Sequence, residues 1–155
     1  STGGFTDVML HHGASRVAAL DVGYGQLHWR LQKDPRVTIL DRTNIRLLEP
    51  DQLPFQPTFA TCDASFISVT TFVDVVFREL TAGGWFVVLV KPQFEVGRER
   101  LPKGGVVRDE KDRMSALDKV RRVALEAGFE EKGAVDSPVH GPKGNREFLL
   151  VLRKP

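Results

Sequence analysis

Short apolar runs alternate along this chain with longer amphipathic segments. The apolar runs are rich in β-branched residues, and we expect them to form strands. Several, such as 86–90, are apolar at every position, which indicates burial on both faces, as in a parallel sheet covered by helices. The predicted strands are Arg16–Asp21, Arg36–Leu40, Pro57–Cys62, Trp85–Val90, Glu130–Val135 and Glu147–Leu152.

The amphipathic segments predict helices, and each segment ends at or near a glycine or a proline. In the last of them, Met114, Leu117, Val120 and Ala124 share one face. Alternating strands and helices favour a doubly wound α/β fold. The predicted helices are Phe5–His12, Gly25–Lys33, Val69–Leu80 and Asp112–Ala127.

The two ends of the chain depart from a simple alternation. Only a turn over 136–146, rich in Pro and Gly, joins the last two strands, so we expect an antiparallel hairpin at the sheet edge. The chain begins on a Gly-rich turn, which in this kind of fold normally follows a first strand. We therefore expect that the first strand is missing from this chain.

Composition sets weak limits on function. The 155 residues are 41% hydrophobic, which suits one domain, and a net charge of +2 permits nucleic-acid binding without requiring it. Cys62 is the one cysteine, and we expect a buried structural thiol in a reducing cytoplasm. We find no signal peptide and no apolar run long enough to span a membrane. The four histidines show no metal-ligand spacing.

Ligands of open α/β sheets bind beyond the carboxyl ends of the strands, so residues there are the candidates for chemistry. The pair Gly3-Gly4 lets the backbone approach a ligand closely, although it also fits an ordinary tight turn. Asp21 ends a predicted strand, where a carboxylate can accept the hydroxyls of a ribose. Capping of a helix is the alternative for Asp21.

Three charged residues stand at or next to apolar positions of the predicted sheet. Asp63 and Lys91 follow neighbouring strands, where a charge is costly unless it is paired or functional. A lysine whose pKa is lowered by burial can act as a general base beside a carboxylate; a structural salt bridge is the alternative. Glu147 shares a face with Leu149 and Val151, although an exposed charge on an edge strand fits the same pattern.

The segment from Lys91 to Arg108 predicts a long loop. Its basic side chains and Phe94 suit a phosphate backbone and a stacked base. Because Glu95 and Glu99 lie in the same segment, a solvated lid is the competing interpretation.

These segments together resemble the TlyA family of hemolysin-like ribosomal RNA methyltransferases, which is related to the FtsJ-like 2′-O-methyltransferases. The resemblance extends from residue 1 to about residue 152. It is carried by STGGFT at 1–6, DVGYGQL at 21–27, RTN at 42–44, DASFIS at 63–68, VKPQFE at 90–95, GGVV at 104–107 and GPKGNRE at 141–147.

The resemblance implies a Rossmann-like, S-adenosylmethionine-dependent methyltransferase fold of seven strands, the last antiparallel. It also implies a Lys-Asp-Lys-Glu catalytic tetrad, in which Asp63, Lys91 and Glu147 match the last three members. The first lysine precedes the Gly-rich motif in the family. We therefore expect residues 1–155 to be an FtsJ-like methyltransferase domain that lacks its first strand and an upstream RNA-binding domain, which puts the activity in the longer parent protein.

The same resemblance assigns ligand contacts. Lys91 would deprotonate or steer a ribose 2′-hydroxyl of ribosomal RNA, supported by Asp63 and Glu147. The implied cofactor-binding residues are Gly3, Gly4, Phe5, Asp21, Val22, Thr43, Asn44 and Asp63. The implied RNA-binding residues are Phe94, Arg98, Arg100, Lys103 and Arg108.

Three other functions remain open at this stage. An oxidoreductase on a similar sheet would use Tyr24 and Lys91 in hydride transfer. The family name invokes membrane lysis, so a membrane-acting protein is a second alternative, although the sequence offers no basic amphipathic helix. The third is a non-catalytic domain that binds cofactor or RNA.

Overall fold

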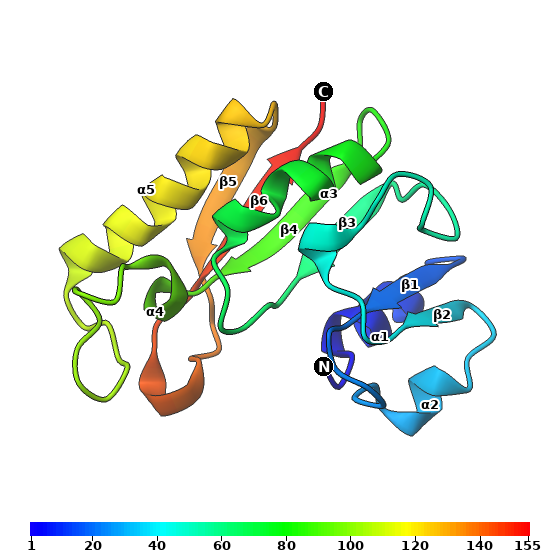
Figure 1. Cartoon of the computed structure of the whole chain (residues 1–155), viewed down its shortest axis with the longest axis horizontal. Helices are drawn as coiled ribbons and strands as arrows, with labels where there is room; N and C mark the ends of the chain where they lie inside the picture. Colours follow the sequence, from blue (N-terminus) through cyan, green and yellow to red (C-terminus); the bar gives the residue numbers. More distant parts are fainter. The chain divides into compact units, whose positions relative to one another are not determined.

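The computed structural model describes residues 1–155 and divides into two units, residues 1–56 and 57–155. Each unit is described by itself, with the elements labelled as in Figure 1. The first unit holds α1 (Gly4–His11), β1 (Val17–Leu20), α2 (Trp29–Gln32), β2 (Val37–Leu40) and the 3-10 turn η1 (Ile45–Leu47). The second holds β3 (Phe59–Cys62), η2 (Val69–Thr71), α3 (Val73–Glu79), β4 (Trp85–Val90), α4 (Pro92–Glu95), α5 (Glu110–Glu126), β5 (Glu130–Asp136), η3 (Pro142–Gly144) and β6 (Phe148–Arg153).

The first unit is built on a parallel pair of strands. β1 and β2 run in register from Val17 opposite Val37 to Leu20 opposite Leu40. A small core of Leu10, Val17, Leu27 and Leu31 packs α1 and α2 against this pair. The parallel pairing places the residues that follow both strands at one end of the unit.

Gly3 fixes the start of α1 within this core. Its φ of 99° is one that glycine adopts without strain. A Cβ at this position would lie 2.5 Å from Cδ1 of both Leu27 and Leu31. The glycine therefore allows the backbone before α1 to lie directly on the side chains around α2.

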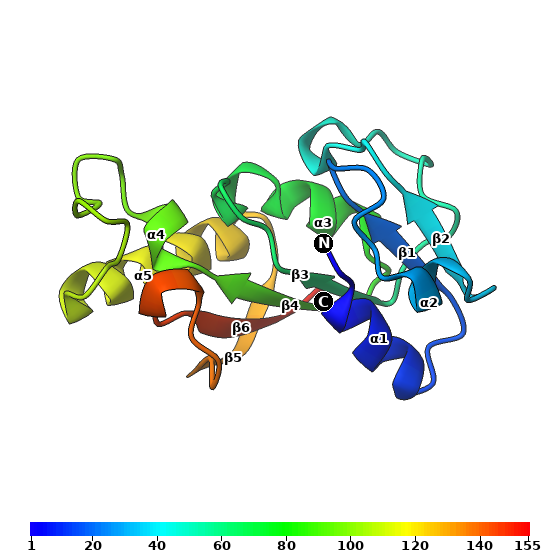
Figure 2. The ribbon, with the colours of Figure 1, turned by 90° about the horizontal axis from the view of Figure 1, so that it is seen from below.

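The second unit is a four-stranded mixed sheet in the order β3-β4-β6-β5. β3 is parallel to β4, and β6 lies antiparallel between β4 and β5. The sequence predicted this antiparallel hairpin correctly; its edge strand is β5. Both views show α3 and α5 over the same face of the sheet (Figures 1 and 2). The sheet contributes five completely buried side chains to the core: Phe86, Val88, Val90, Leu150 and Leu152.

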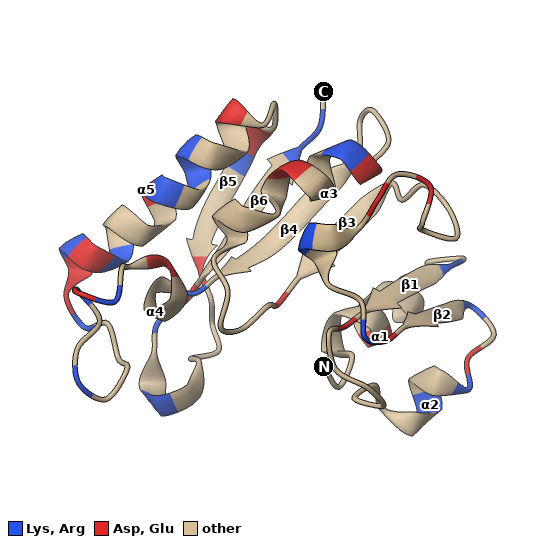
Figure 3. Ribbon diagram, in the orientation of Figure 1, with Lys and Arg blue, Asp and Glu red and all other residues tan.

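The long helix α5 begins where the side chain of Asp109 accepts a hydrogen bond from the amide of Asp112. It buries Leu117, Val120 and Ala124, as predicted. Met114, which was predicted to share a face with them, is 37% exposed. The outer face of α5 carries charges of both signs (Figure 3). No helix of the structure has the length and apolarity needed to cross a membrane.

Arg113, next to Met114 on α5, is buried, with 1% of its surface exposed. Its guanidinium pairs with Glu110 and Asp136 and donates through Nε to the carbonyl of Arg146. It also lies 4.4 Å from the ring centre of Phe148. This one side chain therefore ties α5 to the end of β5 and to the chain just before β6.

Three predicted segments differ in the structure. The helix predicted from Gly25 begins only at Trp29, because His28 accepts the amide of Arg30 and caps the helix there. The helix predicted over 69–80 is divided at Phe72, where hydroxyl bonds around Ser68 hold a separate 3-10 turn. The long loop predicted from Lys91 starts with α4, a single helical turn opened by a proline.

Leu150→Ala tests the assignment of the core. Leu150 is fully buried on β6, so we expect the substitution to lower the free energy of unfolding by about 2–5 kcal/mol. Leu125→Ala on α5 is the matched control, because Leu125 is 52% exposed and its loss should change stability by less than about 0.5 kcal/mol. Urea denaturation followed by fluorescence measures both. Equal losses in the two variants would contradict the assignment.

Candidate active site

Lys91 and Asp63 form an ion pair at the end of two neighbouring strands. Because β3 and β4 are parallel and in register, the residues that follow them meet at one edge of the sheet. Nζ of Lys91 lies 2.6 Å from Oδ1 of Asp63 and donates to Oγ of Ser65 at 2.9 Å. The Lys91 side chain is buried, whereas that of Asp63 is 50% exposed. The amine is therefore held by two partners at the boundary between the interior and solvent.

Glu147 is also buried, but it does not join this pair. Only 3% of its surface is exposed, which excludes the alternative of an exposed edge-strand charge. Its carboxylate forms no ion pair; Oε1 accepts a hydrogen bond of 2.9 Å from Nε2 of Gln93 on α4. The structure thus brings Lys91 and Asp63 together and connects Glu147 to α4.

Glu95 is a buried carboxylate, which does not fit the competing interpretation of its segment as a solvated lid. It accepts hydrogen bonds from the hydroxyl of Ser68 and the amide of Val69, which fasten η2 to α4. Burial raises the pKa of Glu95, against the opposing effect of these bonds and of Lys119. Glu95 therefore holds the chain that follows Asp63 and Ser65 against the chain that follows Lys91.

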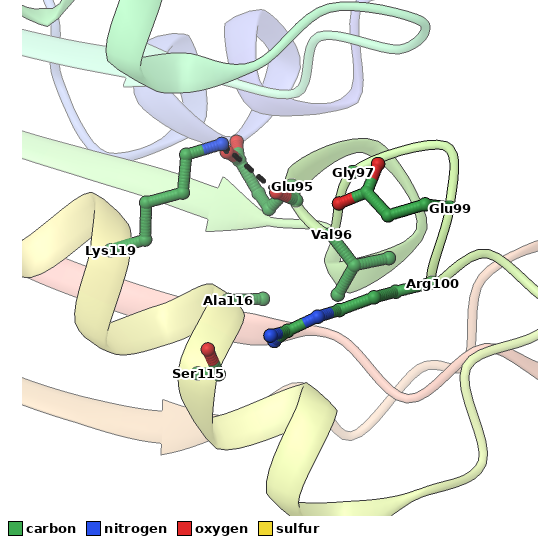
Figure 4. A pocket seen from close by; sticks show the side chains of 8 residues that line it. All are labelled: Glu95, Val96, Gly97, Glu99, Arg100, Ser115, Ala116 and Lys119. Atoms are coloured by element: carbon green, nitrogen blue, oxygen red, sulfur yellow. Dashed lines mark hydrogen bonds and ion pairs between the residues drawn. The ribbon is translucent and has the colours of Figure 1, made fainter.

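A pocket of about 330 Å³ lies next to Glu95, between α5 and the segment that follows α4. Figure 4 shows Lys119 reaching from α5 to Glu95, whose backbone oxygen accepts a hydrogen bond of 2.9 Å from the lysine. Neither Lys91 nor Glu147 lines this pocket. It is therefore separate from the charged groups at the strand ends.

An aromatic pair lies next to the Lys91 site. The ring of Phe66 packs against that of Phe94, with centroids 5.1 Å apart. Phe66 is 90% exposed and has a φ of 64°, which is uncommon for a bulky residue and typical of functional sites. The sequence had indicated Phe94 but not Phe66, although an apolar residue in a polar turn was a usable signal.

The basic residues after α4 are exposed, and their loop is anchored at its far end. Arg98, Arg100, Lys103 and Arg108 all face solvent. Buried Asn145 accepts from the amide of Val107 and donates to the carbonyl of Gly105. The loop is thereby joined to the 141–147 turn, which lies beside α4 in both views (Figures 1 and 2).

The first unit carries its own group of strand-end residues. Oδ1 of Asp21 accepts the amide of Gly23 at 2.8 Å, and the amide of Thr43 donates to the backbone oxygen of Asp21. Asp21 is therefore not a helix cap; its carboxylate organises the turn after β1.

The other predicted cofactor residues of this unit lie in that turn, after β2 or at the start of α1. Val22 is 69% exposed, and Asn44 caps η1 through its side-chain oxygen. Gly4 and Phe5 begin α1, directly after the left-handed Gly3. Asp63, predicted to contact the cofactor as well, belongs to the second unit.

Comparison with known proteins shows the family to which this chain belongs. The FtsJ-like methyltransferase family matches residues 1–154. The chain is 46% identical over 153 residues to the 16S/23S rRNA (cytidine-2′-O)-methyltransferase TlyA of Mycobacterium tuberculosis, covering 99% of the chain and 57% of that protein. It is 46% identical over 156 residues to YqxC of Bacillus subtilis, named as an rRNA methyltransferase, covering 100% and 56%.

Solved structures give the same result for the fold. A structure named as a hemolysin from Streptococcus thermophilus has a TM-score of 0.95 and 46% identity, covering 99% of this chain and 56% of that one. An S-adenosylmethionine-dependent methyltransferase of Listeria monocytogenes, 13% identical with a TM-score of 0.70, covers 99% and 86% and shares the fold alone. The chain spans little more than half the length of the curated relatives it matches.

The reactivity of the Cys62 thiol, at the end of β3, tests how far solvent reaches this edge of the sheet. Burial raises its pKa to about 11, so near pH 8 the native protein should hold about 100-fold less thiolate than an ordinary thiol of pKa 9.0. We expect alkylation by iodoacetamide to be slower by about that factor in native than in urea-unfolded protein, and to accelerate tenfold per unit of pH up to about 11. Equal rates at pH 8 would show an accessible thiol.

Proposed function

We propose, because this chain belongs to the FtsJ-like methyltransferase family, that the protein transfers a methyl group from S-adenosylmethionine to a ribose 2′-hydroxyl of ribosomal RNA. The observation that carries the proposal is the ion pair of Lys91 with Asp63 at the carboxyl ends of β3 and β4. Methylation of a hydroxyl requires a group that takes its proton, and a fixed amine at the rim of the sheet is suited to that task.

The reaction assigns a separate task to each group. The sulfonium of S-adenosylmethionine supplies an already activated methyl group, so the protein has mainly to align the acceptor and remove its proton. Lys91 would steer the 2′-hydroxyl or take its proton as the methyl group passes from the sulfur to the oxygen. Asp63 and Ser65 hold the amine in place, and the carboxylate of Asp63 pairs with the ammonium that results.

The residues of the first unit fit the cofactor. The carboxylate of Asp21 is partly exposed and accepts the amide of Gly23, which supports a role in binding ribose hydroxyls. Gly4 has open space where a side chain would stand, so its backbone is accessible to the amino-acid end of the cofactor. Thr43 and Asn44 follow the adjacent strand and would border the adenine.

The second unit offers groups for RNA. The exposed face of Phe66, supported by Phe94, is a surface on which a base of the target strand can stack. The exposed arginines and lysine after α4 would bind phosphates of the same strand. We assign Phe94, Arg98, Arg100, Lys103 and Arg108 to this contact, with Phe66 added by the structure.

Lys91→Ala tests the catalytic assignment. We expect kcat for methyl transfer to fall by about 10²–10⁴-fold, because the proton acceptor is lost. The affinity for S-adenosylmethionine, measured by calorimetric titration, should stay nearly unchanged. Lys132→Ala is the control, since Lys132 pairs with Glu130 at the start of β5, outside the site. Transfer of tritiated methyl groups to ribosomal RNA, with mapping of 2′-O-methyl positions, is the assay; normal rates in Lys91→Ala would reject the assignment.

Asp21→Asn tests the cofactor site. The substitution keeps an acceptor for Gly23 but removes the charge, so we expect the Kd for S-adenosylmethionine to rise by about tenfold or more. Asp34→Asn is the matched control, because Asp34 also accepts a nearby amide and pairs with Arg36, away from the turn after β1. Titration calorimetry on both variants measures the difference. The same Kd in both would place the ribose elsewhere.

A further inference from the structure

The carboxylate of Glu147 is held in a way that ion pairing does not explain. A buried carboxylate without a cation needs hydrogen bonds or close packing to keep one position. Glu147 is 3% exposed and lies where the 141–147 turn enters β6. Two neighbours, Gln93 and Gly141, restrict the position of its Oε1.

The first neighbour is Gln93. Its Nε2 donates to Oε1 of Glu147 at 2.9 Å, in a bond between two buried side chains. The remaining amide oxygen of Gln93 is buried and has no hydrogen-bond partner. Leaving a buried acceptor unpaired costs free energy, so the orientation of this amide satisfies the carboxylate at the expense of the glutamine.

The second neighbour is Gly141. A Cβ at this position would overlap Oε1 of Glu147, far inside van der Waals contact. The backbone of Gly141 has φ −69° and ψ 177°, which any residue adopts, so conformational freedom does not explain the glycine. The glycine is needed because the carboxylate occupies the place of a side chain.

We infer that Gln93 and Gly141 are positioning residues for the proposed methyl transfer, which act by fixing the carboxylate of Glu147. Gln93 holds it from α4, the helix that directly follows Lys91, and Gly141 leaves the space into which it fits. The inference rests on the proposed function, to which it adds the buried carboxylate of Glu147 as a group that supports Lys91.

The test is Gly141→Ala. The overlapping atom belongs to the end of a flexible side chain, so the fold can accept the new Cβ while the carboxylate must move and lose its bond to Gln93. We expect kcat to fall by about 10²-fold, since a displacement of about 1 Å in an active site has effects of this size. The KM for S-adenosylmethionine and the Tm should remain near those of the wild-type protein.

Gly97→Ala is the matched control. A Cβ at Gly97 would likewise overlap a carboxylate oxygen, that of Glu99, and Gly97 also has no positive φ. Glu99 is exposed and has no part in the proposed reaction. We therefore expect kcat of Gly97→Ala within about twofold of the wild-type value.

A double-mutant cycle separates positioning from a general disturbance of the turn. Glu147→Asp shortens the side chain and withdraws the carboxylate from the new Cβ. If Gly141 acts through Glu147, adding Gly141→Ala to the Glu147→Asp variant should lower kcat by no more than about threefold. Equal and additive losses in the two backgrounds would overturn the inference.

Gln93→Met gives a second measure, because it removes the donor with little change of volume. We expect a loss of kcat comparable to that of Gly141→Ala, again without a change in the KM for S-adenosylmethionine. If the wild-type protein methylates no ribose hydroxyl of ribosomal RNA, the proposed function fails. If the wild-type protein is active and both Gly141→Ala and Gln93→Met match Gly97→Ala, only the present inference fails.

Discussion

The parallel pairing of β3 with β4 is the constraint on which the candidate site depends. It brings Asp63 and Lys91, 28 positions apart in the sequence, to the same edge of the sheet and within 2.6 Å of each other. Separately, each would be a charge at the end of an apolar strand, and burying Lys91 without a partner would be costly. The ion pair is therefore both a requirement of the fold and the basis of the proposed chemistry.

Around this pair, the second unit joins segments that are distant in the sequence. Glu95 fastens η2 to α4, Asn145 fastens the loop after α4 to the terminal turn, and Arg113 fastens α5 to the same turn. All three side chains are buried, and each bonds to a backbone group of the segment that it fastens. The irregular segments of the site are thus held by specific polar contacts, whereas the strands are held by the apolar core.

The sequence predicted the strands well because their apolar runs are continuous and their ends are marked by charge or glycine. β4 has the predicted bounds, and no end of the other strands differs from the prediction by more than two residues. The helices were harder to predict, since capping by His28 and the hydroxyl bonds at Ser68 override the apolar pattern. Within the site, Asp63 and Lys91 could be paired from strand order, but the contacts of Gln93, Glu95 and Arg113 depend on side-chain packing that periodicity does not encode.

The position of β6 has a consequence for how the second unit is assembled. β6 is the last strand in the sequence, yet it lies inside the sheet, where Trp85 faces Arg153 and Val90 faces Phe148. During synthesis, β4 leaves the ribosome well before this partner, so it waits with an unpaired edge until the final strand is made. Such distant pairing slows folding and exposes apolar edges to aggregation. Glu147 immediately precedes β6, so the last step that closes the sheet is also the step that completes the site.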